Sequence, residues 1–115
     1  MDFRQIAADI SVAGQIDVED IATLRNAGFK SIICNRPDGE DFSQTPADIL
    51  RSAVLAAGLE HRFIPVSGTL GASDENVDAT IAALDELPRP ILAYCRSGAR
   101  STNLYQMAVM RGAKS

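Results

Sequence analysis

The chain alternates short runs of apolar residues with longer segments whose apolar positions recur at helical spacing. The short runs predict buried strands, and the longer segments predict helices that pack by one face. Four strand–helix pairs follow one another. The predicted strands cover residues 10–13, 30–34, 61–66 and 91–95. The predicted helices cover residues 18–27, 46–57 and 74–87, and a last helix begins after residue 98.

Residues with capping preferences separate these segments. Asp17, Thr45 and Ser73 stand immediately before predicted helices, where a side-chain oxygen can accept a hydrogen bond from a free backbone N–H group. Gly28 follows the first helix and is expected to end it. The second helix has the clearest signal, because Pro46 stands at its first position.

Strands that alternate with helices in this way form right-handed crossovers and a mostly parallel sheet. We therefore expect an α/β fold: a three-layer sandwich in which helices cover both faces of a sheet of about four strands. A chain of 115 residues supports one core and leaves no room for a second domain, so residues 1–115 should form a single domain. Ligands of such sheets bind beyond the carboxyl ends of the strands. The loops 35–44, 67–72 and 95–101 should share that edge.

Composition and charge narrow the classes of function. The chain has 15 acidic and 11 basic side chains, a net charge of −4 and no Lys/Arg cluster, so we expect no nucleic-acid partner. The longest apolar run, 91–95, is too short to span a bilayer, and residues 1–14 lack the pattern of a signal peptide. We expect a cytoplasmic protein with no membrane partner. Two cysteines and one histidine lack zinc-site spacing, so we expect no metal and no cofactor.

One segment carries the candidate chemistry, because it places a cysteine between a buried strand and a helix. Cys95 becomes a nucleophilic thiolate if backbone N–H groups, the helix N-terminus and nearby cations lower its pKa. Gly98 can take a positive φ and let the loop close around an anion. The predicted catalytic residues are Cys95 and Arg100, whose guanidinium can hold two anion oxygens. The predicted anion-binding loop comprises Arg96, Ser97, Gly98, Ala99, Arg100 and Ser101.

Other reactive residues receive structural interpretations. Cys34 lies in an apolar strand and is predicted to be a core thiol rather than a resolving partner of Cys95. His61 opens a strand and is predicted to be a solvated or hydrogen-bonded histidine rather than a catalytic base. The acidic residues of the loop 38–41 are interpreted as contributing to solubility.

The loop from Cys95 to Ser101 resembles the active loop of rhodaneses, sulfurtransferases with the pattern Cys-x-x-Gly-x-Arg. The rest of the chain resembles the phosphatase-like domain family of β-lactamase-hydrolase-like proteins, which is related in fold to dual-specificity and tyrosine phosphatases. The motifs behind this resemblance span nearly the whole chain and are SVAGQ (11–15), NRPDGE (35–40), IPV (64–66) and AYCRSG (93–98). The resemblance implies a phosphatase-like fold and a cysteine nucleophile. Family members are described both as phosphatases and as sulfur transferases, some of them fused to a persulfide dioxygenase.

The chain departs from tyrosine phosphatases in two places. Their loop reads Cys-x-x-Gly-x-x-Arg after a histidine, whereas here Tyr94 precedes Cys95 and Arg100 arrives one residue early. Their general acid follows the Ile-Pro strand, whereas here no carboxylate occurs before Asp74. A shorter loop leaves less space for a phosphoryl group. Sulfur transfer expels sulfite or a thiolate and so needs no general acid.

These departures favour a sulfurtransferase as the first hypothesis. Cys95 would take sulfane sulfur from thiosulfate or a persulfide, held by Arg100 and the loop N–H groups, and pass it to a thiol acceptor. The second hypothesis is a phosphatase that cleaves a phosphate ester through a phosphocysteine at Cys95, with Asp38 as general acid. The third is a non-catalytic anion-binding or redox-sensing module. Apolar surface after Met107 adds a homodimer to the expected partners.

Overall fold

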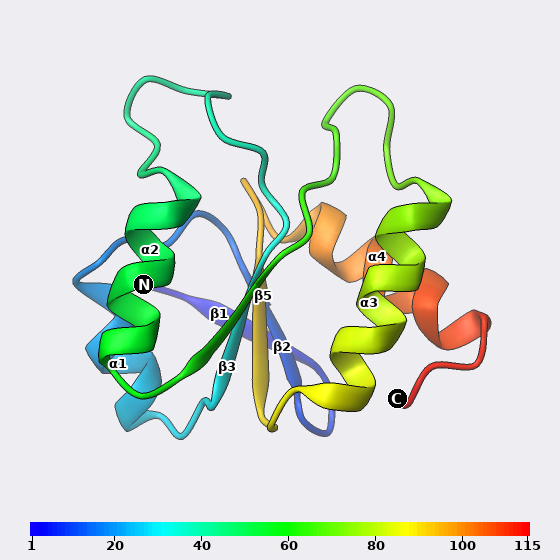
Figure 1. Cartoon of the computed structure of the whole chain (residues 1–115), viewed down its shortest axis with the longest axis horizontal. Coiled ribbons are helices and arrows are strands. Elements are labelled where there is room, and N and C mark those ends of the chain that lie inside the picture. The colour runs from blue at the N-terminus through cyan, green and yellow to red at the C-terminus, as the bar shows by residue number, and fades with distance from the viewer.

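The computed structural model describes all 115 residues and has the predicted α/β sandwich architecture (Figure 1). Its sheet has the strand order β1-β2-β5-β3-β4. Strands β2, β5, β3 and β4 run parallel, and β1 pairs antiparallel with β2 at one edge. The strands are β1 Phe3–Ala7, β2 Ile10–Ala13, β3 Ser31–Cys34, β4 Glu60–Phe63 and β5 Ile91–Tyr94. The helices are α1 Asp20–Asn26, α2 Ala47–Ala56, α3 Asp74–Glu86 and α4 Ala99–Met110.

Helices α1 and α2 cover one face of the sheet, and α3 and α4 cover the other (Figure 1). Successive side chains of a strand point to opposite faces, so Ile32 joins the core beneath α1 and α2 while Ile33 joins the core beneath α3 and α4. The central strands are buried on both sides, which is why they read as continuous apolar runs. None of the helices is long and apolar enough to cross a membrane.

Strand β1 was not predicted. Three of its five residues, Phe3, Arg4 and Gln5, are exposed, so the segment has no buried apolar run that would predict a strand. Its antiparallel pairing with β2 supplies the hydrogen bonds that hold it. The ring of Phe3 packs edge-on against Phe29 with centroids 5.0 Å apart. The sheet therefore has one strand more than the four expected.

The predicted cap of α3 is confirmed. The Asn76 N–H donates to the Ser73 hydroxyl at 3.1 Å, and the Asn76 side chain accepts from the Ser73 N–H at 3.0 Å. The prediction for Asp17 was wrong, because α1 begins only at Asp20. The Asp20 carboxylate accepts from the Asp17 N–H at 2.8 Å, and no side chain caps the first turn of α1.

The predicted cap of α2 was also wrong. The Thr45 hydroxyl donates to the Asp17 carboxylate instead of capping its own helix. The Ala47 N–H at the start of α2 donates to Asp38, nine residues earlier, at 2.8 Å. A residue that the sequence places in the middle of a loop therefore caps the helix that follows the loop.

The loops that follow β3, β4 and β5 meet at one edge of the sheet, as predicted (Figure 1). The loops after β3 and β4 rise on either side of the end of β5, which continues into the loop 95–98 and α4. This edge is the place where a parallel sheet binds its ligand. At the other end of α4, Met110 is 86% exposed, and the homodimer expected from this apolar surface stays a prediction.

Candidate functional site

The loop after β5 wraps closely around a cysteine. Cys95 is fully buried, and its sulfur accepts a hydrogen bond from the Gly98 N–H at 3.0 Å. Gly98 has a φ of 93°, a left-handed conformation that lets the chain turn back over the sulfur and that other residues adopt at a cost. Helix α4 begins at Ala99, so the N–H groups of its first turn have no carbonyl partner within the helix. The structure thus surrounds Cys95 with N–H donors.

The loop after β2 packs closely against the cysteine loop and is hydrogen-bonded to it. The Gln15 N–H donates to the Arg96 carbonyl at 3.3 Å. A Cβ atom on Gly14 would lie 2.9 Å from the same carbonyl oxygen, closer than side chains pack. Only glycine therefore allows the chain after β2 to come this close to the cysteine loop, which explains the glycine of the SVAGQ motif.

The structure also places the remaining residues of the predicted anion-binding loop. Arg96, Ser97 and Ala99 are exposed at its rim, and Ser101 is buried at its base. The Ser101 hydroxyl makes no strict hydrogen bond, but it lies close enough to the thiol to affect its ionisation. The loop residues are therefore together in space as predicted.

Two opposing effects set the pKa of the Cys95 thiol. Burial raises it, because a thiolate is poorly solvated inside the protein. The backbone N–H groups of Ser101, Ser97 and Gly98 and the nearby Ser101 hydroxyl stabilise the thiolate. The stabilising groups outweigh burial, so the pKa of the Cys95 thiol lies below its ordinary value. The other thiol, Cys34, has its pKa raised by burial and donates to the Arg36 carbonyl at 3.4 Å.

We expect the ultraviolet absorbance of the thiolate to rise at a lower pH than that of an ordinary cysteine, and this signal to be missing in Cys95→Ser. In Ser101→Ala the transition should move to higher pH, because one stabilising donor is lost. Cys34→Ala is the matched control and should leave the transition where it is. If the transition vanishes in Cys34→Ala, the thiol with the lowered pKa is Cys34 and not Cys95.

Arg100 is held at the mouth of the loop by Glu40, a carboxylate for which the sequence predicts only a contribution to solubility. Its guanidinium donates to both oxygens of Glu40 at 2.9 Å and to the Val66 carbonyl at 2.8 Å. Three of its five N–H donors are used in this way, which leaves two for an anion. Hydrogen bonds to Glu40 raise the pKa of Arg100, and the neighbouring Cys95 adds to the effect.

Glu40 binds a second arginine as well. The Arg36 side chain, only 4% exposed, donates to Glu40 at 2.9 Å and to the Gln15 side chain at 3.0 Å. Hydrogen bonds from Arg100, opposed by partial burial and aided by Arg36, lower the pKa of Glu40 to about 2. Glu40 is therefore a fixed negative charge that positions Arg100. The spacing of Arg36 and Glu40 in NRPDGE is the only sequence signal for this cluster.

The Glu40 pair should make stability depend on pH. Its folded pKa of about 2 lies below the ordinary value of 4.5, so the stabilisation is complete above pH 4.5 and is lost as the pH falls towards 2. Glu40→Gln should lower the free energy of unfolding at pH 7 by on the order of 1–2 kcal/mol, with partial solvent screening included. The difference from the wild type should shrink in urea titrations at pH 3. Glu86→Gln, which breaks only the exposed pair with Arg62, should change stability much less at either pH.

Two residues considered at the sequence level lie away from Cys95. Asp38, the suggested general acid, caps α2 and lines a surface hollow over α2 and β4 that no residue of the cysteine loop lines. His61 lines the same hollow. Both of its ring nitrogens are buried without a partner, and burial lowers its pKa to about 4. The prediction of a solvated or hydrogen-bonded histidine was therefore wrong, and His61 is a neutral, half-buried side chain.

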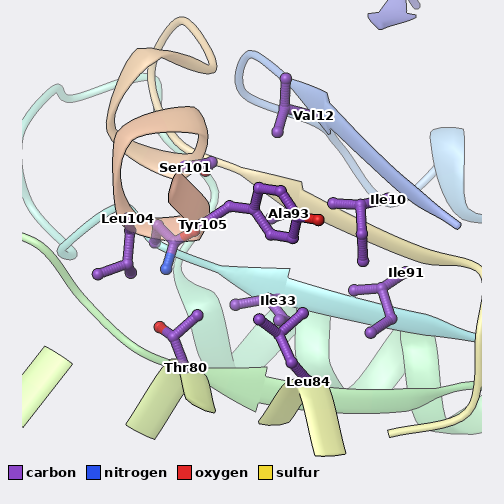
Figure 2. A pocket seen from close by; sticks show the side chains of 11 residues that line it. Ile10, Val12, Ile33, Thr80, Leu84, Ile91, Ala93, Ser101, Leu104 and Tyr105 are labelled. Atoms are coloured by element: carbon purple, nitrogen blue, oxygen red, sulfur yellow. The ribbon is translucent and has the colours of Figure 1, made fainter. Parts of the chain in front are cut away.

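A small cavity lies on the α4 side of the cysteine loop (Figure 2). Ser101 and Tyr105 project into it from α4, and the ring of Tyr105 extends over the sheet. Its volume of about 20 Å³ accommodates roughly one water molecule. The cavity is therefore too small for a substrate, and Cys95 is not among the residues that line it.

Comparison with known proteins connects this geometry to a family. The model of the phosphatase-like domain of beta-lactamase hydrolase-like proteins matches residues 2–111. A beta-lactamase hydrolase-like protein of Agrobacterium fabrum is 38% identical over 96 residues, which are 84% of this chain and 22% of that protein. The chain thus spans less than a quarter of the length of this curated relative.

Solved structures of phosphatases have the same fold. A Neisseria meningitidis protein named as a candidate phosphatase is 28% identical, with a TM-score of 0.78 over 86% of this chain and 70% of that chain. The core catalytic domain of a PP-IP phosphatase from S. cerevisiae has a TM-score of 0.69 at 19% identity, over 95% of this chain and 64% of that chain. The second likeness concerns the fold alone.

Proposed function

Since the chain belongs to the phosphatase-like domain family of beta-lactamase hydrolase-like proteins, we propose that it is a cysteine-dependent phosphatase. It hydrolyses a phosphate ester through a phosphocysteine at Cys95. The observation that carries this proposal is the thiol itself, which lies in a ring of N–H donors with the Arg100 guanidinium beside it. This arrangement provides a nucleophile and a binding site for three phosphoryl oxygens in one loop.

The reaction takes two displacements at phosphorus. The Cys95 thiolate attacks the phosphorus atom, and an S–P bond forms as the P–O bond to the leaving group breaks with its electron pair. Water then attacks the same phosphorus, the P–S bond breaks, and the thiolate is restored as inorganic phosphate departs and a water proton passes to solvent. The loop N–H groups and the two free donors of Arg100 stabilise the charge on the equatorial oxygens in both steps.

Phosphoryl transfer, the second sequence hypothesis, is favoured over sulfur transfer. The Neisseria meningitidis protein, 28% identical, is named as a candidate phosphatase, which supports phosphoryl transfer and gives no support to sulfur transfer. The arginine comes one residue earlier than in tyrosine phosphatases, which at the sequence level disfavours a phosphoryl group. In the fold, Arg100 lies in the first turn of α4 and its guanidinium still reaches the mouth of the loop. The shorter spacing is therefore compatible with binding a phosphoryl group.

The proposal is tested by incubating the protein with 4-nitrophenyl phosphate, quenching in acid and measuring the mass of the peptide that contains Cys95. We expect release of nitrophenol and an added phosphoryl group on Cys95, and neither in Cys95→Ser. A parallel incubation with thiosulfate tests the alternative. An added sulfur atom on Cys95 without phosphate hydrolysis would show that the protein is a sulfurtransferase and that the proposal is wrong. No adduct from either compound would also contradict the proposal and would indicate a non-catalytic module.

A further inference from the structure

Each carboxylate on the segments that follow β3 and β4 is bound to another group of the protein. A general acid usually speeds the departure of an alkoxide leaving group by about 10² to 10⁴. The candidates are the carboxylates of the loop after β3 and the first carboxylate after β4, and each has a definite partner. They are Asp38, Glu40, Asp41 and Asp74.

The first two are bound within the fold. Asp38 accepts the Ala47 N–H at 2.8 Å and faces the hollow over α2 and β4. Glu40 accepts from Arg36 and Arg100 at 2.9 Å, and its pKa of about 2 keeps it ionised at any pH at which the protein would act. A carboxylate that is already ionised has no proton to give to a leaving group.

The other two are bound near the surface. Asp41 accepts from the Ser43 N–H at 3.1 Å and from its hydroxyl at 3.2 Å, and these bonds lower its pKa. Asp74 pairs at 2.8 Å with Arg111, which lies beyond the far end of α4. The one histidine is uncharged, because burial lowers the pKa of His61 to about 4, and it lines the hollow over α2 and β4 rather than the cysteine loop.

From this arrangement we infer the substrate class: a phosphorylated compound whose leaving group departs as a stable anion, without a proton. Acyl phosphates and phosphate esters of acidic phenols belong to this class, and alkyl phosphates do not. In the first displacement the P–O bonding pair leaves on a carboxylate or phenolate, and Cys95 keeps the phosphoryl group. The inference rests on the proposed function, because it describes the first of its two steps.

The test is a series of aryl phosphates that differ only in the pKa of the phenol. The rate constant to follow is kcat/KM, because it reports formation of the phosphocysteine, whereas kcat can be limited by the common second step. We expect kcat/KM to fall by about tenfold for each unit by which the phenol pKa rises. Acetyl phosphate should be hydrolysed, and an alkyl phosphate such as glycerol phosphate should not. A flat series, or an alkyl phosphate cleaved as fast as the most acidic phenol ester, would overturn the inference.

Matched variants identify any carboxylate that does act as an acid. Asp38→Asn, Asp41→Asn and Asp74→Asn each keep a hydrogen-bond acceptor in place and should leave the slope of the series unchanged. If one of them steepens the slope, that residue is a general acid and the inference is wrong. Failure of the proposed function looks different, because then no member of the series is hydrolysed and no phosphocysteine forms.

Discussion

Replacing Cys95 by serine is expected to reduce kcat/KM for an aryl phosphate by about 10⁴-fold or more, the scale of loss when a covalent nucleophile is removed. The serine hydroxyl has a far higher pKa than the thiol, and the N–H donors that lower the thiol pKa do not ionise a hydroxyl at neutral pH. Steady-state release of the phenol, followed by absorbance, measures the loss.

The matched control is Cys34→Ala, which removes the only other thiol. Cys34 lies in the core beneath α1 and α2 and makes one weak bond to the Arg36 carbonyl. We expect this variant to lose some stability and to keep its activity within a few-fold. Equal losses in the two variants would mean that Cys95 is not the nucleophile.

Arg100→Ala is expected to lower kcat/KM by about 10²- to 10³-fold, because the donors that stabilise the charge on the phosphoryl oxygens disappear. The ion pair with Glu40 is lost as well, so binding must be measured separately from catalysis. In a Cys95→Ser background, inorganic phosphate should raise the melting temperature, and adding Arg100→Ala should remove that rise.

Two further variants separate shape from charge. Arg100→Lys keeps the charge but cannot bind two oxygens through a planar fork, so it should recover only part of the loss. Arg62→Ala breaks an exposed pair with Glu86 and should change neither activity nor phosphate binding. If Arg100→Ala keeps full phosphate binding, its guanidinium does not hold the anion.

Local patterns were sufficient to predict most of the fold. The apolar run of β5 and the helical spacing of α3 are patterns of residues within one short segment of the chain, so they can be recognised without knowledge of the fold. Both elements are present in the structure. The pattern failed for β1, whose exposed residues are held by pairing with β2 rather than by burial. It failed again for the start of α1, which begins at Asp20 and has no side-chain cap.

The candidate site divides in the same way. The residues from Cys95 to Ser101 are contiguous, so their chemistry could be recognised from their order. The role of Glu40 could not, because its partner Arg100 lies 60 residues further along the chain. Its neighbours Asp38 and Asp41 are acidic too, which is typical of a solvated loop. Long-range ion pairs of this kind become visible only when the strands have placed their loops side by side.

Glu40 also links the loops of all four parallel strands. Through Arg36 it reaches Gln15 after β2, and through Arg100 it reaches the loop after β5 and the Val66 carbonyl after β4. Such a connection makes the loops a single cooperative unit in local unfolding. Amide protons in the four loops should therefore exchange with solvent at similar opening free energies. Loss of this one carboxylate should raise their exchange rates together while the sheet stays protected.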